Sequence, residues 1–310
     1  MGGALKAVGD NSMQTIEEMI DLFRVQPGKR VKLKDFDPAW SGDEEIPKAD
    51  RRRYAEDLLS QDISALAEAQ ELLYASDRWS LLLIFQAMDA AGKDGTIKHV
   101  MSGVNPQGCQ VYSFKHPSAE ELDHSFLWRC MKALPERGRI GIFNRSYYEE
   151  VLIVRVHPEL LVAQRVPGAK PNGKLWKQRY DDINRFERHL TRNGTKVLKF
   201  FLHISKDEQR KRFLERVDTP KKHWKFSSSD MSERERWDDY MRAYEKALSA
   251  TSTEWAPWYV VPANHKWVSR TMVAAIVTSA IRSLDIKYPE VTPAQAEQIA
   301  QAKQRLETGD

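Results

Sequence analysis

Short apolar segments alternate with amphipathic stretches along most of this chain. Five of the apolar segments predict buried strands: residues 81–85, 110–114, 139–143, 196–202 and 258–261. Between and around them, apolar residues at helical spacing predict helices over residues 54–74, 118–133, 175–191 and 267–284. Because strands that alternate with helices form parallel sheets covered on both faces, we expect an α/β fold with about five parallel strands.

Two helix starts are marked by their sequence. Ser118 is followed three residues later by Glu121, and Ser205 by Glu208 in the same way. This spacing predicts a capping box, in which the serine and the glutamate each bond a backbone N–H group of the first turn. We therefore expect one helix from Ser118 to about residue 133 and another directly after the fourth strand.

The most informative segment, residues 87–96, follows the first predicted strand and reads A-M-D-A-A-G-K-D-G-T. A buried strand that leads through a glycine-rich turn into a helix places free backbone N–H groups against an anion. Gly92 lets the backbone approach a phosphate closely, and Lys93 supplies a positive charge to the transferred group. The segment predicts a phosphate-binding loop; the alternative is an ordinary strand–turn–helix with an exposed lysine.

This loop departs from the usual phosphate-loop pattern. Ala87 stands where glycine usually begins the motif, and Asp94 replaces the serine or threonine after the lysine. Thr96 comes two residues later, so its hydroxyl is not expected to hold a metal in the usual way. Asp89, inside the loop, is therefore the candidate oxygen ligand for Mg²⁺, with Mn²⁺ as an alternative.

A second informative segment, I-F-N-R-S-Y-Y-E-E at residues 142–150, ends the third predicted strand. Phosphate-loop enzymes usually place an aspartate there to hold magnesium, whereas this chain has Asn144. Arg145 can bind phosphate oxygens bidentately. Glu149 and Glu150 are either metal or nucleotide contacts or an acidic first helical turn. Arg155, on the same predicted helix, is either a phosphate contact or part of a structural ion pair.

Composition narrows the class of protein. A chain of 310 residues with 41% hydrophobic and 30% charged residues fits a soluble globular protein. The apolar runs are too short to cross a bilayer and residues 1–14 lack a signal-type core, so we expect a cytoplasmic protein without a membrane partner. Cys109 and Cys130 fall in segments expected to be buried and are predicted to be reduced thiols. We find no Ser-His-Asp, Cys-His or zinc-ligand pattern.

The positive charge is concentrated in one window. The whole chain carries a formal net charge of +4, whereas residues 210–225 contain seven basic and two acidic residues. The basic residues are Arg210, Lys211, Arg212, Arg216, Lys221, Lys222 and Lys225. This pattern favours a polyanion or several phosphates as the partner, and a solvated helix face is the alternative.

The same region has the position of a lid. It lies between the fourth and fifth strands, where phosphate-loop kinases carry a mobile element that excludes water from the reaction. Trp224, Phe226 and Trp237 favour hinge packing over base stacking. We expect no nucleic-acid partner, because no RNA-binding motif accompanies the basic residues.

Three strings together resemble the polyphosphate kinase 2 family, whose members use inorganic polyphosphate as phosphoryl donor. They are M-D-A-A-G-K-D-G-T-I-K at 88–98, F-N-R-S-Y-Y-E-E-V at 143–151 and R-F-L-E-R-V-D-T-P-K-K-H-W-K-F at 212–226, and A-P-W-Y-V-V-P-A-N-H-K-W at 256–267 also looks like the family's last strand and following helix. The resemblance covers roughly residues 30–285. It implies metal binding by Asp89, phosphate contact by Lys93 and Arg145, and a donor channel that includes Arg216 and Lys222.

Two departures point to a subgroup. Many members of the family carry aspartate where this chain has Asn144, and asparagine where it has Glu149. These features look like the one-domain subgroup that phosphorylates both nucleoside monophosphates and diphosphates. We therefore assign Asn144 and Glu149 to nucleotide binding.

The motifs and the resemblance together give a full set of site predictions. The catalytic residues are Asp89, Lys93 and Arg145. The residues expected to bind phosphate or polyphosphate are Ala91, Gly92, Lys93, Asp94, Gly95, Thr96, Lys98, Arg145, Arg155, Arg216 and Lys222. We expect an N-terminal arm over residues 1–50, a kinase domain over 51–290 with a helical lid at about 206–250, and a polar helical tail over 291–310.

The predicted activity is a reversible, Mg²⁺-dependent transfer from polyphosphate to AMP and ADP or other purine nucleotides, by a homo-oligomer (a dimer or tetramer). The nearest alternative is an ATP-dependent nucleoside monophosphate kinase of the thymidylate-kinase type. A binding regulator without turnover is a third hypothesis, and the presence of both Asp89 and Lys93 disfavours it.

Overall fold

The computed structural model describes residues 16–227 and 229–309. The expectation that residues 1–14 lack a signal segment lies outside the described residues. None of the helices in the described part is both long and apolar enough to cross a membrane. Cys109 and Cys130 are free thiols, and burial raises their pKa values to about 11 and about 12.

One parallel sheet forms the centre of the described chain. Its strands pair in the order β2–β3–β1–β4–β5. They are β1 (Ser80–Ala87), β2 (Cys109–Ser113), β3 (Ile140–Asn144), β4 (Thr195–His203) and β5 (Trp258–Pro262). Every residue of the central strand β1 is buried, as expected for a parallel strand covered on both faces. The predicted α/β fold and its five strands are confirmed.

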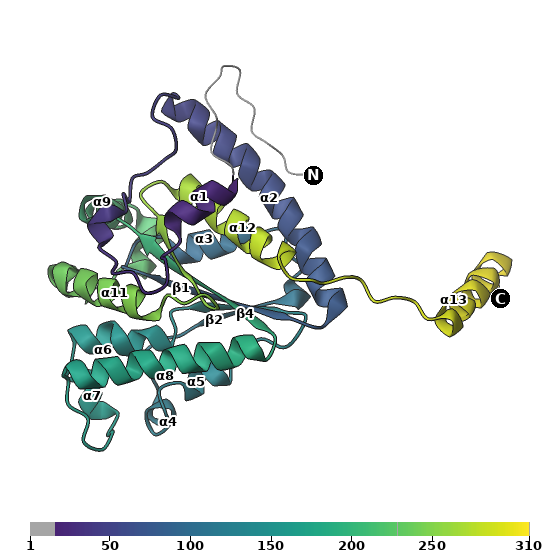
Figure 1. Cartoon of the computed structure of the whole chain (residues 1–310). Coiled ribbons are helices and arrows are strands. Elements are labelled where there is room, and N and C mark those ends of the chain that lie inside the picture. The colour runs from purple at the N-terminus through teal and green to yellow at the C-terminus, as the bar shows by residue number, and fades with distance from the viewer. Residues whose placement is uncertain (1–15, 228, 310) are drawn as a thin grey trace.

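Helices cover both faces of this sheet (Figure 1). One face carries α1 (Ile16–Phe23), α2 (Lys48–Ser76), α3 (Lys93–Val100) and α12 (Lys266–Arg282). The other carries α6 (Ile153–Val156), α8 (Gly173–Arg192) and α11 (Trp237–Thr251). Helices α2 and α12 pack against each other, and most of α12 is buried.

The predicted lid is a run of helices between β4 and β5. It contains α9 (Lys206–Val217), η4 (Pro220–Lys225), α10 (Ser229–Glu235) and α11. Trp237 at the start of α11 is buried, which supports hinge packing for this side chain, whereas Trp224 and Phe226 are exposed. The short helices η1 (Leu33–Asp35), η2 (Pro106–Gly108) and α7 (Leu160–Ala163) lie in other connections. Helix α13 (Pro293–Thr308) lies apart from the rest (Figure 1), and none of its residues is buried.

Residues 16–47 pack on the sheet. Phe23, Val25 and Leu33 are buried in the same core as the strands. The Val25 N–H donates to the Trp258 carbonyl at 2.9 Å, and the Leu33 N–H donates to Glu245 Oε1 at 2.9 Å. This segment is therefore anchored to β5 and to α11.

The helix predicted from Ser118 to residue 133 is wrong as a continuous element. The capping box between Ser118 and Glu121 is present, but it opens only α4 (Ala119–Leu122), and α5 (Trp128–Met131) follows separately. The His124 ring bonds the Glu120 carbonyl at 2.8 Å, the acceptor that the His124 N–H would use in a continuing helix. The side chain thus replaces the backbone bond that would have extended α4.

The helix expected after the third strand is also interrupted. A 3-10 helix, η3 (Tyr147–Val151), is followed by the one-turn helix α6. Arg179 Nη1 donates to the Glu150 carbonyl at 2.8 Å, the oxygen that the Val154 N–H would need in a regular α-helix. A contact from α8 therefore sets the backbone here, and local sequence could not predict it.

The buried carboxyl of Asp62 on α2 makes the stability of the protein depend on pH. It is buried, its Oδ2 atom has no hydrogen-bond partner within the described chain, and burial raises its pKa to about 6 against the partly opposing charge of Arg282. The folded protein therefore holds this proton more tightly than the unfolded chain. Above pH 6 the buried charge costs about 3 kcal/mol, and below about pH 4 this cost disappears.

We expect Asp62→Asn to raise the free energy of unfolding by up to about 3 kcal/mol at pH 8, with the gain vanishing near pH 4. Urea unfolding at the two pH values measures it, and Asp57→Asn, at an exposed position of the same helix, is the control. A gain that is equal at both pH values would contradict the explanation.

Candidate active site

The loops that leave β1 and β3 meet at the carboxyl edge of the sheet. Phe85 of β1 pairs with Asn144 of β3, and the Arg145 N–H donates to the Phe85 carbonyl at 3.0 Å. Ala90 and Arg145 both adopt left-handed backbone conformations, with φ of 61° and 66°. Such φ values are uncommon for residues other than glycine and concentrate at functional sites.

The loop after β1 ends in an open helix N-terminus. Gly92 has φ of 103° and precedes α3, and within the described chain no side chain caps the first N–H groups of α3. An uncapped N-terminus of this kind attracts an anion through its N–H groups and the helix dipole. The strand, the turn through Gly92 and the helix that a phosphate loop requires are present in the expected order.

Lys93 folds back over the loop. Its Nζ donates to the Ala87 carbonyl at 3.0 Å. Burial lowers the pKa of Lys93, Asp89 raises it and Arg145 lowers it. A backbone oxygen thus holds the ammonium beside the anion site, and the nearby charge of Asp89 favours its protonated form.

Polar groups from β3 face the same loop. Arg145 Nη2 lies 3.5 Å from Asp89 Oδ1 in a half-exposed ion pair. Asn144 Nδ2 donates to Asp94 Oδ1 at 2.7 Å. Two polar contacts thus join the end of β3 to the phosphate loop and to the first turn of α3.

Arg212 on α9 supports the phosphate loop through hydrogen bonds to the loop backbone. Its side chain is nearly buried, and all five N–H groups have partners. It donates to the carbonyls of Ala90 (3.1 Å), Ala91 (2.9 Å), Ala263 (2.6 Å) and Asn264 (3.0 Å) and to Glu208 Oε1 (2.9 Å). One guanidinium therefore links α9, the phosphate loop and the connection from β5 to α12. Its donors are already used within the protein.

These groups line one cavity of about 600 Å³. Most of the residues predicted to form the site lie along it: Asp89, Ala91, Gly92, Lys93, Asp94, Gly95, Thr96, Asn144, Arg145, Arg216 and Lys222. Arg216 Nη1 pairs with Asp230 Oδ2 at 2.9 Å, and Lys222 pairs with Glu215. The structure brings the phosphate loop, the third strand and the lid together at this cavity.

The cavity also contains residues that sequence reasoning missed. Lys115 comes from the segment after β2, and Lys266 and Arg270 come from the first turns of α12. Burial and the neighbouring charges of Arg212, Lys222 and Arg270 lower the pKa of Lys266. A signal was available, because Lys266 and Arg270 lie four residues apart at the start of a helix whose one other charged residue is Arg282, at its end.

Three predicted residues do not line this cavity. Lys98 is exposed on α3. Arg155 donates to the Tyr180 hydroxyl at 2.9 Å and lies over the Trp176 ring, which supports the structural alternative for this residue. Glu149 is absent from the lining, although its charge interacts with those of Arg145 and Lys93.

Glu150, the alternative contact in the same segment, is buried in an ion pair with Arg179 at 2.7 Å. Its carboxylate also accepts from Gln164 Nε2 at 2.6 Å. We conclude that Glu150 has a structural role.

Glu149 lies outside the cavity lining and interacts electrostatically with Arg145. Burial raises the pKa of this carboxyl, Arg145 and Lys93 lower it, and Asp89 raises it. When the Gln86 amide is oriented to match its neighbours, its nitrogen donates to Glu149 Oε1 at 2.9 Å and its oxygen accepts from the Ser146 N–H at 3.1 Å. Glu149 is therefore positioned by β1 and is electrostatically coupled to both cations of the site.

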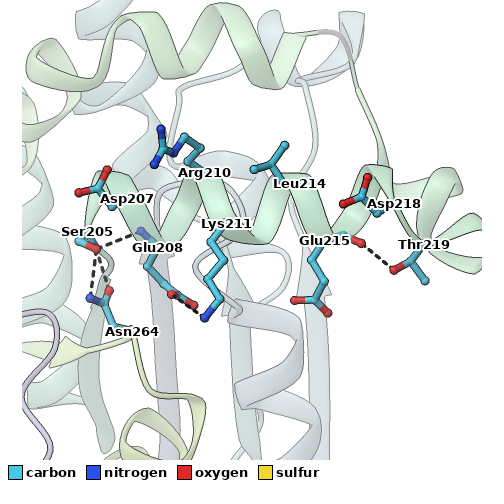
Figure 2. Close-up of a pocket in the computed structure, with 10 residues that line it drawn as sticks. All are labelled: Ser205, Asp207, Glu208, Arg210, Lys211, Leu214, Glu215, Asp218, Thr219 and Asn264. Atoms are coloured by element: carbon cyan, nitrogen blue, oxygen red, sulfur yellow. Dashed lines mark hydrogen bonds and ion pairs between the residues drawn. The ribbon is translucent and has the colours of Figure 1, made fainter.

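The basic cluster of residues 210–225 divides between two surfaces. Arg212, Arg216 and Lys222 face the phosphate loop. Arg210 and Lys211 line a separate hollow of about 800 Å³ on α9 (Figure 2). Figure 2 also shows that Ser205 bonds Asn264, so its N–H is used by the Asn264 oxygen and the capping box predicted at Ser205 is only half formed. The basic cluster of residues 210–225 therefore does not form one continuous surface for binding phosphate.

Comparisons with known proteins agree with this geometry. A model of the family described as polyphosphate kinase 2 matches residues 48–289. The chain is 55% identical over 285 residues to the ADP-polyphosphate phosphotransferase of Rhodopseudomonas palustris, covering 92% of this chain and 97% of that protein. It is 46% identical over 268 residues to the AMP/ADP-polyphosphate phosphotransferase of Meiothermus ruber, covering 86% and 95%. The crystal structure of polyphosphate kinase 2 from Arthrobacter aurescens superposes with a TM-score of 0.80 at 41% identity, over 91% and 96% of the two chains.

The contacts of Arg212 predict a strong effect of Arg212→Lys. A lysine cannot bond four carbonyls at once, so the phosphate loop loses its support and turnover falls about a hundredfold, with a lower Tm. Arg210→Lys, two residues earlier on the same helix, should leave both quantities unchanged. Steady-state kinetics and thermal unfolding of the two variants measure this. Equal effects of the two substitutions would contradict the assigned role of Arg212.

Proposed function

This chain belongs to the polyphosphate kinase 2 family, and we propose that it phosphorylates both nucleoside monophosphates and nucleoside diphosphates. Transfer of a phosphoryl group from polyphosphate to a nucleotide is the activity of the chain. The observation that carries the proposal is the cavity in which a phosphate loop, an acidic group for a metal and an excess of basic side chains meet. The relative from Meiothermus ruber, named for both AMP and ADP, supports the dual acceptor.

The charges of the cavity suit a polyanionic donor. Its lining includes eight basic and four acidic side chains. The basic ones are Lys93, Lys115, Arg145, Arg212, Arg216, Lys222, Lys266 and Arg270. Arg212 adds only its charge, because its donors are used within the protein, but the others come from the loop, the sheet edge, the lid and α12, so a chain of linked phosphates could contact several elements at once. A donor with only three phosphates needs fewer such contacts, which disfavours the thymidylate-kinase alternative.

A divalent cation fits the acidic side of the cavity. Asp89 is half-exposed, with its carboxylate beside Arg145, and it contributes to the raised pKa of Asp230 after the effect of burial. Mg²⁺ usually takes one or two carboxylates together with water and substrate phosphate oxygens. We therefore propose Asp89 as the protein ligand of Mg²⁺, with Mn²⁺ as a substitute. The bound ion would neutralise charge on the reacting phosphates.

The residues suggest how the transfer proceeds. The terminal P–O bond of polyphosphate breaks while a phosphate oxygen of the nucleotide forms a new P–O bond, and the shortened polyphosphate leaves. Lys93 and the N–H groups of α3 bind the transferred group, and Arg145 stabilises its equatorial oxygens. Asn144 and Glu149 orient the acceptor. The exchange conserves the number of phosphoanhydride bonds when ADP becomes ATP, and the reaction is therefore reversible.

We further propose that the enzyme works in the cytoplasm as a homo-oligomer. The two free thiols are consistent with a reducing compartment. Helix α13 exposes Ile299 and Leu306 away from the rest of the chain, and burial of these side chains in an assembly would be favourable.

Nucleotide analysis tests the proposed donor and both acceptors. Purified protein is incubated with Mg²⁺ and AMP, with either polyphosphate or GTP as donor, and the products are separated by chromatography. We expect ADP first and ATP later with polyphosphate, and no transfer from GTP. If ADP accumulates without ATP, the proposal of two acceptors is wrong. Transfer from GTP alone would contradict the polyphosphate donor.

Two conservative substitutions test the assigned chemistry. Asp89→Asn removes the metal's carboxylate, and Lys93→Met removes the charge but keeps the side-chain length. We expect each to lower kcat about a thousandfold, with Tm within a few degrees of the wild type. Lys98→Met, on the exposed side of α3, is the control and should keep full activity. Near-normal kcat in either variant would remove that residue from the mechanism.

A further inference from the structure

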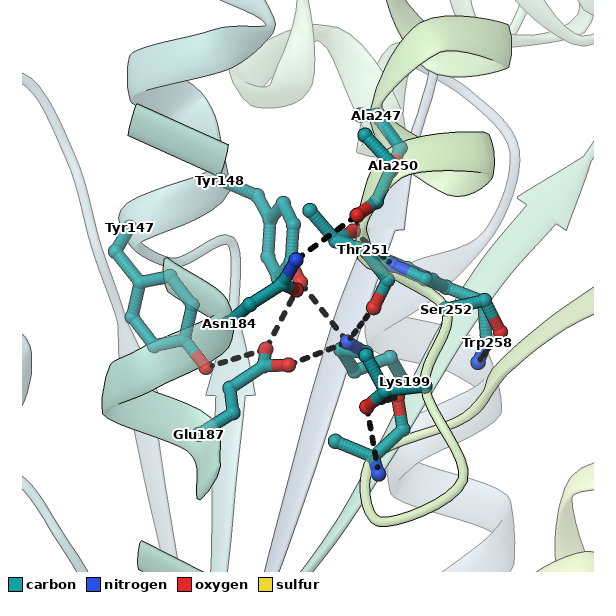
Figure 3. A network of polar contacts seen from close by, with 12 residues as sticks. Tyr147, Tyr148, Asn184, Glu187, Lys199, Ala247, Ala250, Thr251, Ser252 and Trp258 are labelled. Atoms are coloured by element: carbon teal, nitrogen blue, oxygen red, sulfur yellow. Dashed lines mark hydrogen bonds and ion pairs between the residues drawn. The ribbon is translucent and has the colours of Figure 1, made fainter. Parts of the chain in front are cut away.

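A buried ion pair lies outside the active-site cavity, on the other side of η3. Glu187 of α8 and Lys199 of β4 have no exposed side-chain surface, and Lys199 Nζ lies 2.5 Å from Glu187 Oε2. Figure 3 shows them at the centre of a polar cluster between the sheet, α8 and α11. Neither residue lines the active-site cavity.

The hydrogen bonds of this pair are complete. Lys199 Nζ donates to Glu187, to the Tyr148 hydroxyl at 3.0 Å and to the Thr251 carbonyl at 2.6 Å. Glu187 Oε1 accepts from the Tyr147 and Tyr148 hydroxyls at 2.9 and 2.8 Å. All three N–H groups of the ammonium are used, and the second carboxylate oxygen bonds two tyrosines.

The pair connects two elements that border the site. Tyr147 and Tyr148 begin η3, directly after Ser146 and only two and three residues from Arg145. Thr251 is the last residue of α11, where a positive charge is favourable because the helix dipole is negative. Lys199 therefore joins the end of α11 to the segment that carries Arg145 and Glu149 (Figure 3).

Neighbouring bonds fix the end of α11 further. Asn184 Nδ2 donates to the Ala250 carbonyl at 2.9 Å, and Trp258 Nε1 donates to the Thr251 hydroxyl at 2.9 Å. The Trp258 ring also packs edge-on against Tyr148, with ring centroids 4.7 Å apart. The C-terminal end of α11 is thus anchored to α8, β5 and η3 at once.

Helix α11 also packs against η3, the segment that carries Glu149. Burial raises the pKa of Tyr244 well above its ordinary value, and the charges of Glu149 and Asp89 raise it further. Tyr240 also has its pKa raised, with Glu149 among the causes. Both tyrosines of α11 therefore interact electrostatically with Glu149 of η3.

We propose that Glu187 and Lys199 are positioning residues that set the spacing between α11 and the Arg145–Glu149 segment, and so shape the acceptor side of the site. This inference rests on the proposed function, in which Glu149 orients the nucleotide. A buried ion pair adds little stability compared with apolar residues of similar volume, because desolvation offsets the attraction. The pair instead fixes the relative orientation of the segments it joins, through five hydrogen bonds that an apolar pair cannot make.

The test is the double variant Glu187→Leu/Lys199→Met, which removes both charges together and leaves neither one unpaired. We expect a Tm within a few degrees of the wild type and a nucleotide KM raised about tenfold with a lower kcat. The KM for polyphosphate should change less than about twofold, because Arg216, Lys222 and Lys266 come from α9, η4 and α12, to which the hydrogen bonds of the pair do not extend. A packing defect alone would not separate the two KM values in this way.

Two further variants keep the test decisive. Tyr148→Phe removes the hydroxyl that bonds both charged partners, and we expect a smaller rise in nucleotide KM with polyphosphate KM unchanged. Ser252→Ala is the control, since Ser252 bonds the Val25 carbonyl and the Trp258 N–H at the same end of α11 without contacting η3. It should lower Tm without changing either KM.

An unchanged nucleotide KM in both the double variant and Tyr148→Phe would overturn the inference, as would equal changes in the two KM values. If the double variant does not fold, Tyr148→Phe decides alone. Absence of polyphosphate-dependent transfer in the wild type would instead remove the proposed function, so the two failures are distinguishable.

Discussion

The active site depends on how one arginine, Arg212, holds together segments that are far apart in the chain. Its guanidinium bonds carbonyls of the phosphate loop and of the connection after β5, while Glu208 bonds its Nε–H. The loop backbone can therefore keep its unusual conformation at Ala90 and direct N–H groups toward the cavity. Because lid helix α9 carries this arginine, the lid and the phosphate loop are supported by the same bonds.

The charges of the cavity follow from this arrangement. Burial lowers the pKa of Lys93, and Arg145 lowers it further, but the carboxylate of Asp89 partly offsets both effects. Asp89 pairs with Arg145, Asp230 with Arg216 and Glu215 with Lys222, so several charges of the cavity have an opposite neighbour before any substrate binds. Phosphates and a metal would exchange these partners with little reorganisation, which is how preorganised sites lower a barrier. The buried Glu187–Lys199 pair lies outside the cavity. In our proposal it acts on the site indirectly, because it fixes the backbone of η3 and the end of α11 and does not contact the substrate.

The sequence predicted the sheet, the phosphate loop and the position of the lid, since these depend on local patterns. Apolar runs marked the strands, and Gly92 with Lys93 marked the loop. The sequence alone could not predict that Arg212 supports the loop while Arg210 lines a different hollow, because this depends on which side of α9 packs against the loop. The broken helix after β3 was missed for a similar reason: Arg179, from a distant helix, takes the Glu150 carbonyl. Lys266 and Arg270 became site residues only when α12 packed beside the loop.

We propose that polyphosphate lies in the cavity between the phosphate loop, the lid and α12. A crystal structure of the protein with a short polyphosphate and no nucleotide would show where the donor binds. We expect phosphate density against the first N–H groups of α3 and Lys93, continuing past Lys266 and Arg270. Density in the outer hollow of α9, against Arg210 and Lys211, would contradict it.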